Sequence, residues 1–330
     1  MVEPKLFMTL PEEYVCTPDG MTVDKEGNLI LSCPNYADPR MSGCVVRITK
    51  DKKVEKWFDV PRHPDTGLAR NMGIELDENG NVYLCDNQDW KRSPETRCKG
   101  RVLRIKADEQ GNILESRVVA WNMEHPNGIR IRDGWMYVTQ SRMPDVKHPS
   151  GYMTSGVYRF RLEDENIRVS NTMEDSNLFA VFLTRNPECQ YGADGIAFSP
   201  SGDLYVGNFG DGEIYRLTFA PNGELADNVP FARDPAQLVS TDGMIFDERG
   251  NLYIADFRVN AICKMYSDGR LERIAQSPDC DGLDGGLDQP GEPIIWQEKL
   301  IASCFDLSVG PGKVNTAHEM PATMSELPLI

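Results

Sequence analysis

Short runs in which apolar and polar residues alternate recur along this chain. Each run is followed by a turn and a second apolar run, as in "YGADGIAFSPSGDLYVGNF" at 191–209 and "TDGMIFDERGNLYIAD" at 241–256. Alternation over about five residues is typical of a half-buried strand, and Asp, Gly and Asn between two such runs supply the turn of a hairpin. Each copy therefore predicts two antiparallel strands.

The pattern occurs six times. The other copies are "PDGMTVDKEGNLILSC" at 18–33, "NMGIELDENGNVYLCDN" at 71–87, "NGIRIRDGWMYVT" at 127–139 and the shortened "GEPIIWQEKLIASC" at 291–304. The six copies start near residues 19, 71, 127, 194, 242 and 292, at intervals of 48 to 67 residues. A repeat of this length indicates an array of one supersecondary unit, such as a propeller blade.

A second pair of strands is predicted after five of these hairpins, at 43–57, 100–116, 156–169, 212–226 and 260–274. Four short strands per repeat, without helical periodicity, predict an all-β fold: a six-bladed β-propeller with four antiparallel strands per blade. Residues 1–330 form one predicted domain without a linker. The strand "KLFMTL" at 5–10 is predicted to complete the last blade, because closure removes the open edges of the sheets.

The D-x-x-G-N segments between the strands superficially resemble calcium loops. "DKEGNL" at 24–29 and "DENGNV" at 77–82 lack the alternating ligand spacing of an EF-hand and its glutamate at the twelfth position. We predict that they are turns.

Composition narrows the class of protein. With 40% hydrophobic and 26% charged residues the chain has the composition of a soluble globular protein. A net charge of −16 argues against a nucleic-acid partner or an anionic membrane surface, since both attract basic faces. The chain shows no secretory signal pattern and no membrane span, and its nine cysteines include no C-x-x-C, so we expect reduced thiols and a cytoplasmic protein. The oligomeric state is not specified by the sequence.

The start of each blade's first strand is the predicted functional position. In a propeller these strands line the central channel, so their first residues meet at one mouth. The residues there are Asp19, Asn71 (one place earlier than strict register), Asn127, Asp194, Asp242 and the pair Gly291 and Glu292. Converging carboxylates repel unless a cation neutralises them, and oxygen ligands favour Ca²⁺ first and Mg²⁺ or Mn²⁺ next, with Zn²⁺ as a further candidate. The alternative is that each Asp or Asn caps the backbone of its own turn.

These motifs resemble the senescence marker protein/gluconolactonase (regucalcin-like) family of six-bladed propellers, over essentially the whole chain. The resemblance rests on "DGM" with Asp19, "ARNMG" with Arg70 and Asn71, "PNG" with Asn127, and "ADGI" with Asp194. Two departures are Asp19, where the family has a glutamate, and Met72, where it has an acid.

The resemblance implies one catalytic divalent ion held by Asp19, Asn127 and Asp194, with Asn71 completing the site or contacting the substrate and Arg70 facing the substrate. It also implies hydrolysis of a lactone, typically of a sugar acid. The ion would polarise the ring carbonyl, and Asp194 would act as general base on a water molecule.

Further substrate-binding candidates come from position alone. His125 precedes "PNG" and is expected near the mouth, and Asp242 and Glu292 are additional acids without a role in the family. Weaker candidates in two long insertions are Trp90, Lys147, His148 and Tyr152.

The sequence thus predicts a metal-dependent lactonase or esterase that acts on a small molecule. Two alternatives stay open, because one scaffold hosts many functions. One is a non-catalytic propeller that binds a ligand or a protein. The other is different chemistry on the same scaffold, such as phosphotriester hydrolysis or the condensation carried out by strictosidine-synthase relatives.

Overall fold

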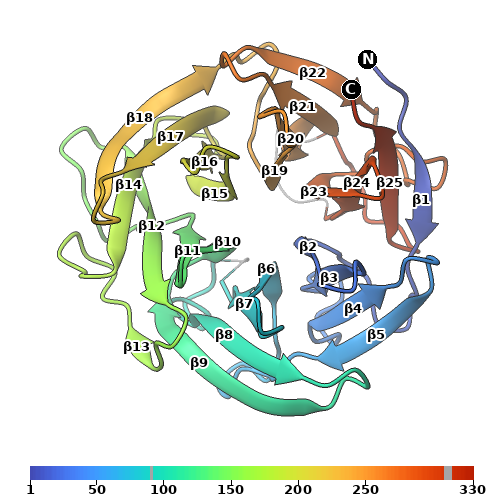
Figure 1. The fold of residues 1–330 in the computed structure, drawn as a ribbon, viewed down its shortest axis with the longest axis horizontal. Coiled ribbons are helices and arrows are strands. Elements are labelled where there is room, and N and C mark those ends of the chain that lie inside the picture. Colours follow the sequence, from blue (N-terminus) through green and yellow to red (C-terminus); the bar gives the residue numbers. More distant parts are fainter. Residues whose placement is uncertain (90–91, 308–313) are drawn as a thin grey trace. The chain divides into compact units, whose positions relative to one another are not determined.

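The strands of this chain form six antiparallel sheets, shown in a computed structural model that describes residues 1–89, 92–307 and 314–330 (Figure 1). Each sheet has four antiparallel strands, and one carries an additional short strand. The predicted all-β fold class, a six-bladed β-propeller, is confirmed. Within the described ranges the only helix is a single 3₁₀ turn, η1 (Phe257–Val259), and no helix there is long and apolar enough to cross a bilayer.

The chain divides into two compact units, and one of them joins both chain ends. The N-terminal unit is Pro11–Val181, and the C-terminal unit combines Met1–Leu10 with Phe182–Ile330. Strand β14 (Leu178–Thr184) crosses the boundary between them.

The sheets of the N-terminal unit follow the chain in order. The first sheet holds β2 (Met21–Val23), β3 (Leu29–Cys33), β4 (Cys44–Ile48) and β5 (Val54–Asp59). The second holds β6 (Asn71–Leu76), β7 (Val82–Asp86), β8 (Gly100–Ala107) and β9 (Ile113–Met123). The third holds β10 (Pro126–Arg132), β11 (Trp135–Gln140) and β12 (Met153–Arg161), with β14 as its outer strand.

The outer strand of the third sheet differs from the prediction. The segment 166–169 was expected to pair with the strand before it, but its core, β13 (Ile167–Arg168), pairs in parallel with β9 of the second sheet. The outer position is taken by β14, whose alternating "LFAVFLT" is the stronger strand sequence. Two residues of β13 are too short to cover the nine residues of β12.

The C-terminal unit holds the other three sheets. The fourth consists of β15 (Ala193–Phe198), β16 (Leu204–Asn208), β17 (Glu213–Phe219) and β18 (Leu225–Arg233). The fifth consists of β19 (Met244–Phe246), β20 (Leu252–Asp256), β21 (Ala261–Met265) and β22 (Leu271–Gln276). The sixth consists of β23 (Pro290–Trp296), β24 (Lys299–Cys304), β25 (Thr323–Pro328) and β1 (Lys5–Thr9), so that the first strand of the chain is the outer strand of the last sheet.

The D-x-x-G-N segments are hairpin turns. In the first sheet the Asp24 carboxylate accepts hydrogen bonds from the backbone N–H and the side-chain amide of Asn28, both at 2.8 Å. Gly27 between them has φ +82°, a conformation that favours glycine. The aspartate is therefore used by its own turn, as predicted, and the same pair of bonds joins Asp247 to Asn251.

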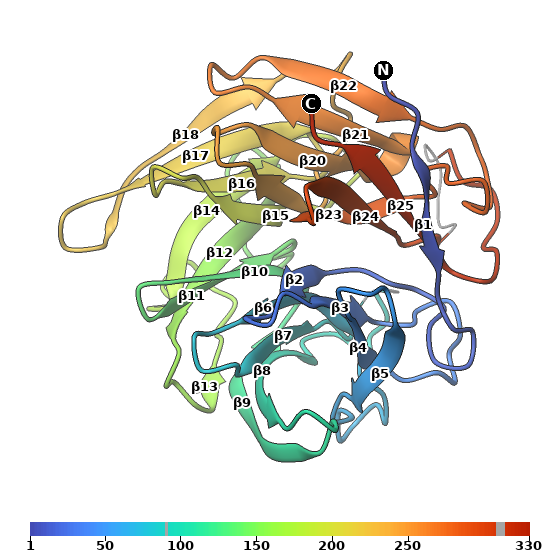
Figure 2. The ribbon, with the colours of Figure 1, turned by 45° about the vertical axis from the view of Figure 1, so that its right-hand side comes forward.

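Apolar side chains pack between neighbouring sheets within each unit. Ile30 and Val45 of the first sheet form one buried cluster with Ile74 and Leu84 of the second. All nine cysteines lie in the described ranges as free thiols, six of them buried. This packing fixes how the first strands of adjacent sheets approach each other, and Figures 1 and 2 show β2, β6 and β10 side by side in the N-terminal unit.

Candidate functional site

The predicted functional position lies at a β-bulge near the start of the first strand of a sheet. In β15, Ala193 pairs with Asn208, but the next paired residue is Ile196, opposite Val206. The register shift leaves Asp194 and its neighbour Gly195 outside the ladder. Bulges redirect side chains away from the regular pleat, and they are frequent beside functional sites.

The same register shift recurs in three other first strands. In β6, β10 and β23 it leaves out, respectively, Met72 and Gly73, Asn127 and Gly128, and Gly291 and Glu292. Met72 and Gly291 are therefore the structural counterparts of Asn127 and Asp194. Asn71 lies one place before this position and Glu292 one place after it.

Asp19 and Asp242 have a common backbone setting in the first and fifth sheets. The Asp19 N–H donates to the Ser32 carbonyl at 2.9 Å, and the Asp242 N–H donates to the Ala255 carbonyl at 2.9 Å. In return, the Ser32 N–H donates to the carbonyl of Gly20, and the Ala255 N–H donates to the carbonyl of Gly243. Each of these glycines directly follows the aspartate. The two carboxylates are thus presented from equivalent points of their strands.

Glycine follows the site residue because the first strands approach very closely. In the N-terminal unit, a Cβ added to Gly20 would lie 2.7 Å from the Met72 carbonyl oxygen. A Cβ on Gly73 would overlap the Asn127 carbonyl oxygen. The starts of β2, β6 and β10 therefore lie side by side, with Asp19 at one end of the row and Asn127 at the other.

The C-terminal unit repeats this arrangement with three acids. A Cβ on Gly195 would overlap the Asp242 carbonyl oxygen, and a Cβ on Gly243 would overlap the Glu292 carboxylate. Asp194, Asp242 and Glu292 are therefore brought to neighbouring points on β15, on the segment before β19, and on β23.

The side chains at these points are largely removed from solvent. Asp19 and Asp194 are each 5% exposed, Asn127 is 6% exposed and Glu292 is 9% exposed, while Asp242 is half-buried. Burying a carboxylate is costly unless a positive charge or hydrogen-bond donors compensate. The donor set consists of carboxylate and carboxamide oxygens, which fits a hard divalent cation better than a soft one.

Asn71 has a structural role. Its side-chain amide donates to Ser32 Oγ at 2.7 Å and to the Cys44 carbonyl at 3.0 Å, so the group is directed at β3 and β4. A Cβ on Gly43 would overlap Asn71 Oδ1, which is buried and accepts no hydrogen bond within the described ranges. Contact of Asn71 with an ion or a substrate stays a prediction.

Arg70 is turned toward the loop that follows β3. Its Nη1 donates to the carbonyl oxygens of Pro34, Asn35 and Met41 at 2.9, 2.5 and 2.9 Å, and its guanidinium lies over the Tyr36 ring. Burial lowers the pKa of Arg70 from its ordinary value, although the group remains a cation at neutral pH. These bonds do not test the predicted contact of Arg70 with substrate, which stays a prediction.

His125 is buried directly before β10. Burial lowers the pKa of His125 to about 3, and the charges of Arg142 and Arg92 act in the same direction. The imidazole is therefore neutral at physiological pH and carries no positive charge next to Asn127.

Of the four loop candidates, Trp90 lies outside the described residues. Lys147, His148 and Tyr152 are exposed, and the first two bond within their own loop, to the Pro144 carbonyl and Ser150 Oγ. Their contribution to specificity stays a prediction.

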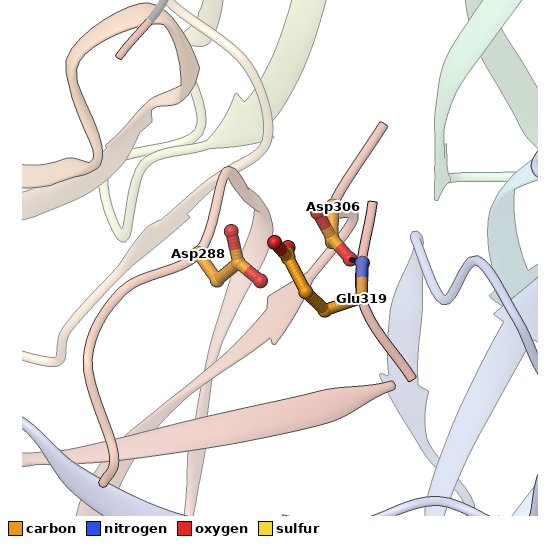
Figure 3. Close-up of side chains that lie close together, drawn as sticks. All are labelled: Asp288, Asp306 and Glu319. Atoms are coloured by element: carbon orange, nitrogen blue, oxygen red, sulfur yellow. Dashed lines mark hydrogen bonds between the residues drawn. The ribbon is translucent and has the colours of Figure 1, made fainter. Parts of the chain in front are cut away.

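Three further acids, which the sequence did not single out, meet in the loops that flank strands of the sixth sheet. Figure 3 shows the side chains of Asp288, Asp306 and Glu319 turned toward one another, and carboxylate oxygens of the three lie within 4.8 Å of each other. Asp288 and Asp306 are buried and Glu319 is half-buried. They come from loops before β23, after β24 and before β25, where no repeat aligns them, so sequence periodicity gives no signal for this group.

The carboxylates of this group are only partly compensated. Asn315 Nδ2 donates to Asp288, while Asp306 bonds His318 Nδ1 at 2.9 Å and the Glu319 N–H at 2.7 Å. Burial, with the Asp306 charge, raises the pKa of Asp288 to about 8, and the same two causes raise the pKa of Glu319. Either a proton or a cation would relieve this crowding.

Comparison with known proteins identifies the fold. No protein-family profile and no curated protein matches the chain. Similar solved structures include a luciferin-regenerating enzyme, with a TM-score of 0.66 at 13% identity over 99% of this chain and 96% of that one. A gluconolactonase from Xanthomonas campestris gives 0.58 at 18% identity over 99% and 95%. Regucalcin from Agrobacterium tumefaciens, a calcium-binding protein, gives 0.62 at 12% identity over 98% and 93%.

These likenesses agree with the resemblance noted in the sequence, since gluconolactonase and regucalcin are among the neighbours. At such low identity they show the fold alone, and the chemistry has to be argued from the residues.

Proposed function

We propose that this chain is a divalent-metal-dependent hydrolase that opens a lactone of a sugar acid or a related cyclic ester. Asp19, Asn127 and Asp194 would hold the ion, and Ca²⁺ is the ion that their oxygen atoms favour first, ahead of Mg²⁺, Mn²⁺ and Zn²⁺. The observation that carries the proposal is the repeated bulge, which presents the nearly buried oxygen ligands Asn127 and Asp194 at equivalent points of β10 and β15. Regucalcin and gluconolactonase among the structural neighbours support it.

A bound divalent ion would polarise the lactone carbonyl and stabilise the oxyanion that develops on it. Asp194 would accept a proton from the attacking water as the water oxygen bonds to the carbonyl carbon. When the ring C–O bond breaks, Asp194 would return that proton to the leaving alkoxide, and the product is a hydroxy acid.

The other acids would shape the site for its substrate. Asp242 and Glu292 are near Asp194 in the C-terminal unit, and their carboxylates suit the hydroxyl groups of a sugar acid. Neutral His125 beside Asn127 would contact the substrate without attracting anions. A small-molecule substrate and nine free thiols are consistent with the proposed cytoplasmic location.

The test combines metal analysis with turnover. We expect about one equivalent of divalent metal in the purified protein, and hydrolysis of sugar-acid or aromatic lactones that EDTA abolishes and added metal restores. Asp194→Asn should lower kcat about 100-fold or more, because the carboxamide cannot accept the proton. The control is Asp227→Asn, the same chemical change on an exposed residue of β18 in the same sheet, which should leave kcat unchanged.

Two results would count against the proposal. Absence of metal and turnover, even after metal is added, would leave a non-catalytic binding propeller. Turnover of phosphotriesters but not of lactones would keep the metal site and replace the substrate class.

A further inference from the structure

The backbone that leads to Asp19 is held by the buried side chain of Asn35. Asn35, which is fully buried, lies in the loop after β3 with φ +54°. Its Oδ1 accepts from the N–H groups of Cys16 and Thr17 at 3.0 and 3.4 Å, and its Nδ2 donates to the Tyr14 carbonyl at 3.0 Å. One carboxamide therefore ties down three of the residues just before Asp19.

Two further bonds join the same segments. The Asn35 N–H donates to the Thr17 carbonyl at 3.3 Å, and the Ala37 N–H donates to Thr17 Oγ1 at 3.1 Å. Thr17 is fully buried and stands two residues before Asp19. The loop after β3 thus acts as the support on which the Asp19 backbone rests.

This loop is in turn held by Arg70. The Arg70 Nη1 donates to the carbonyls of Pro34 and Met41 at both ends of the loop and to the carbonyl of Asn35 itself. Arg70 is 7% exposed, and its backbone N–H donates to the Asp86 carboxylate at 2.8 Å. A buried guanidinium is tolerated where it finds hydrogen-bond acceptors, and here Nη1 directs its donors at the backbone of one loop.

We propose that Asn35 and Arg70 are positioning residues that set the place of Asp19 as a metal ligand. The inference rests on the proposed function, since it takes Asp19 to hold the ion. Metal ligands must keep their geometry to within about half an ångström, which loops rarely do unless a second layer of hydrogen bonds supports them. Loss of either side chain lets the segment 14–19 move and lowers affinity for the ion, without removing any ligand atom.

The experiment titrates the full-length protein with Ca²⁺ alone by calorimetry, and it follows hydrogen exchange in the peptide that covers residues 14–19. Asn35→Gly removes the carboxamide and tolerates the positive φ. It should weaken Ca²⁺ binding at least tenfold and speed exchange at Cys16 and Thr17 by a similar factor. Arg70→Lys keeps the charge, but its side chain is one atom shorter than that of arginine, so the ammonium stops short of the position of Nη1; it should weaken binding several-fold.

Asn28→Ala is the matched control. Asn28 belongs to the same hairpin, but it bonds the turn at the far end of the strand from Asp19. It should lower Tm and leave Ca²⁺ affinity within twofold. If Asn35→Gly does not fold, Thr17→Val replaces it, because it removes one hydroxyl acceptor and preserves the shape of the side chain.

Unchanged Ca²⁺ affinity in Asn35→Gly and Arg70→Lys would overturn the inference. A rise in KM for Arg70→Lys at unchanged Ca²⁺ affinity would also overturn it, and would make Arg70 a substrate-contacting residue. Asp19→Asn distinguishes failure of this inference from failure of the proposed function. If this variant binds Ca²⁺ as the wild type does, the proposed metal site is wrong. The exchange rates then decide alone whether Asn35 and Arg70 fix this backbone.

Discussion

At the scale of single residues, Asp288 is a carboxyl group whose charge the fold strongly disfavours. It is 1% exposed, and it faces two other carboxyl groups across less than 4.8 Å. Its pKa, raised to about 8 from 3.8, means that the folded protein keeps a proton that the unfolded chain has lost at neutral pH. Hydrogen bonding to Asp306 raises the pKa of His318, and burial raises that of Glu319, so both neighbours also favour proton uptake by the folded state.

Stability should therefore fall as pH rises across this range. The contribution of Asp288 is complete below about pH 4 and is lost as the pH passes through about 8. Asp288→Asn keeps the shape of the side chain without its charge. Between pH 5 and pH 8.5 the free energy of unfolding of this variant should therefore fall by about 1–3 kcal/mol less than that of the wild type. Urea unfolding in EDTA at several pH values measures this, with Asp227→Asn as control, and parallel pH profiles for Asp288→Asn and the wild type would contradict it.

At the scale of elements, the approach of one first strand to the next decides the site. Gly73 is needed on β6 because a Cβ at this position would meet the backbone of β10, at Asn127, Gly128 and Ile129. The sequence offered an Asp-Gly or Asn-Gly pair as a turn or cap, which local propensity alone cannot distinguish from a packing requirement. The requirement becomes visible only when the strands of different sheets are placed together.

Gly73→Ala should consequently destabilise the protein by about 3 kcal/mol, because rigid backbone on the neighbouring strand cannot move aside. Gly80→Ala is the comparison, since Gly80 has open space around it and has a φ of +76°. The only cost of this substitution is the strain of alanine at positive φ, about 1 kcal/mol. Chemical unfolding of both variants measures the difference. Equal losses would show that the close approach carries no cost of its own.

Hairpins were predictable from the sequence because each is local: an alternating run, a turn with glycine, and a second run. The elements that the sequence missed are those set by distant partners. β13 was expected beside β12 but pairs with β9. In β6 the bulge places Met72, and not Asn71, in line with Asn127, so the Asn71 carboxamide instead bonds β3 and β4. The acids around Asp288 come from three loops outside the repeat, and only the folded chain brings them together.

At the scale of the whole molecule, the sixth sheet depends on both ends of the chain. Strand β1 pairs antiparallel with β25, with Lys5 opposite Glu326 and Thr9 opposite Thr323. Phe7 is buried and packs edge-on against Trp296 at a centroid distance of 5.7 Å. The sequence predicted a strand at 5–10 to complete this sheet, because an open edge on β25 would expose unpaired backbone groups.

Removal of residues 1–10 should therefore lower the free energy of unfolding by about 3 kcal/mol or more and promote aggregation through β25. Because β1 and β25 are antiparallel neighbours, the end of β25 and the start of β1 are adjacent, and a short glycine-serine linker can join Ile330 to Val2. A circular permutant that begins at Pro11 and ends with residues 2–10 should regain most of the lost Tm, since it restores the same ladder as a local hairpin. If the permutant melts as early as the truncated chain, the free N-terminus does more than supply a strand, and the closing of the sixth sheet is not what residues 1–10 contribute to stability.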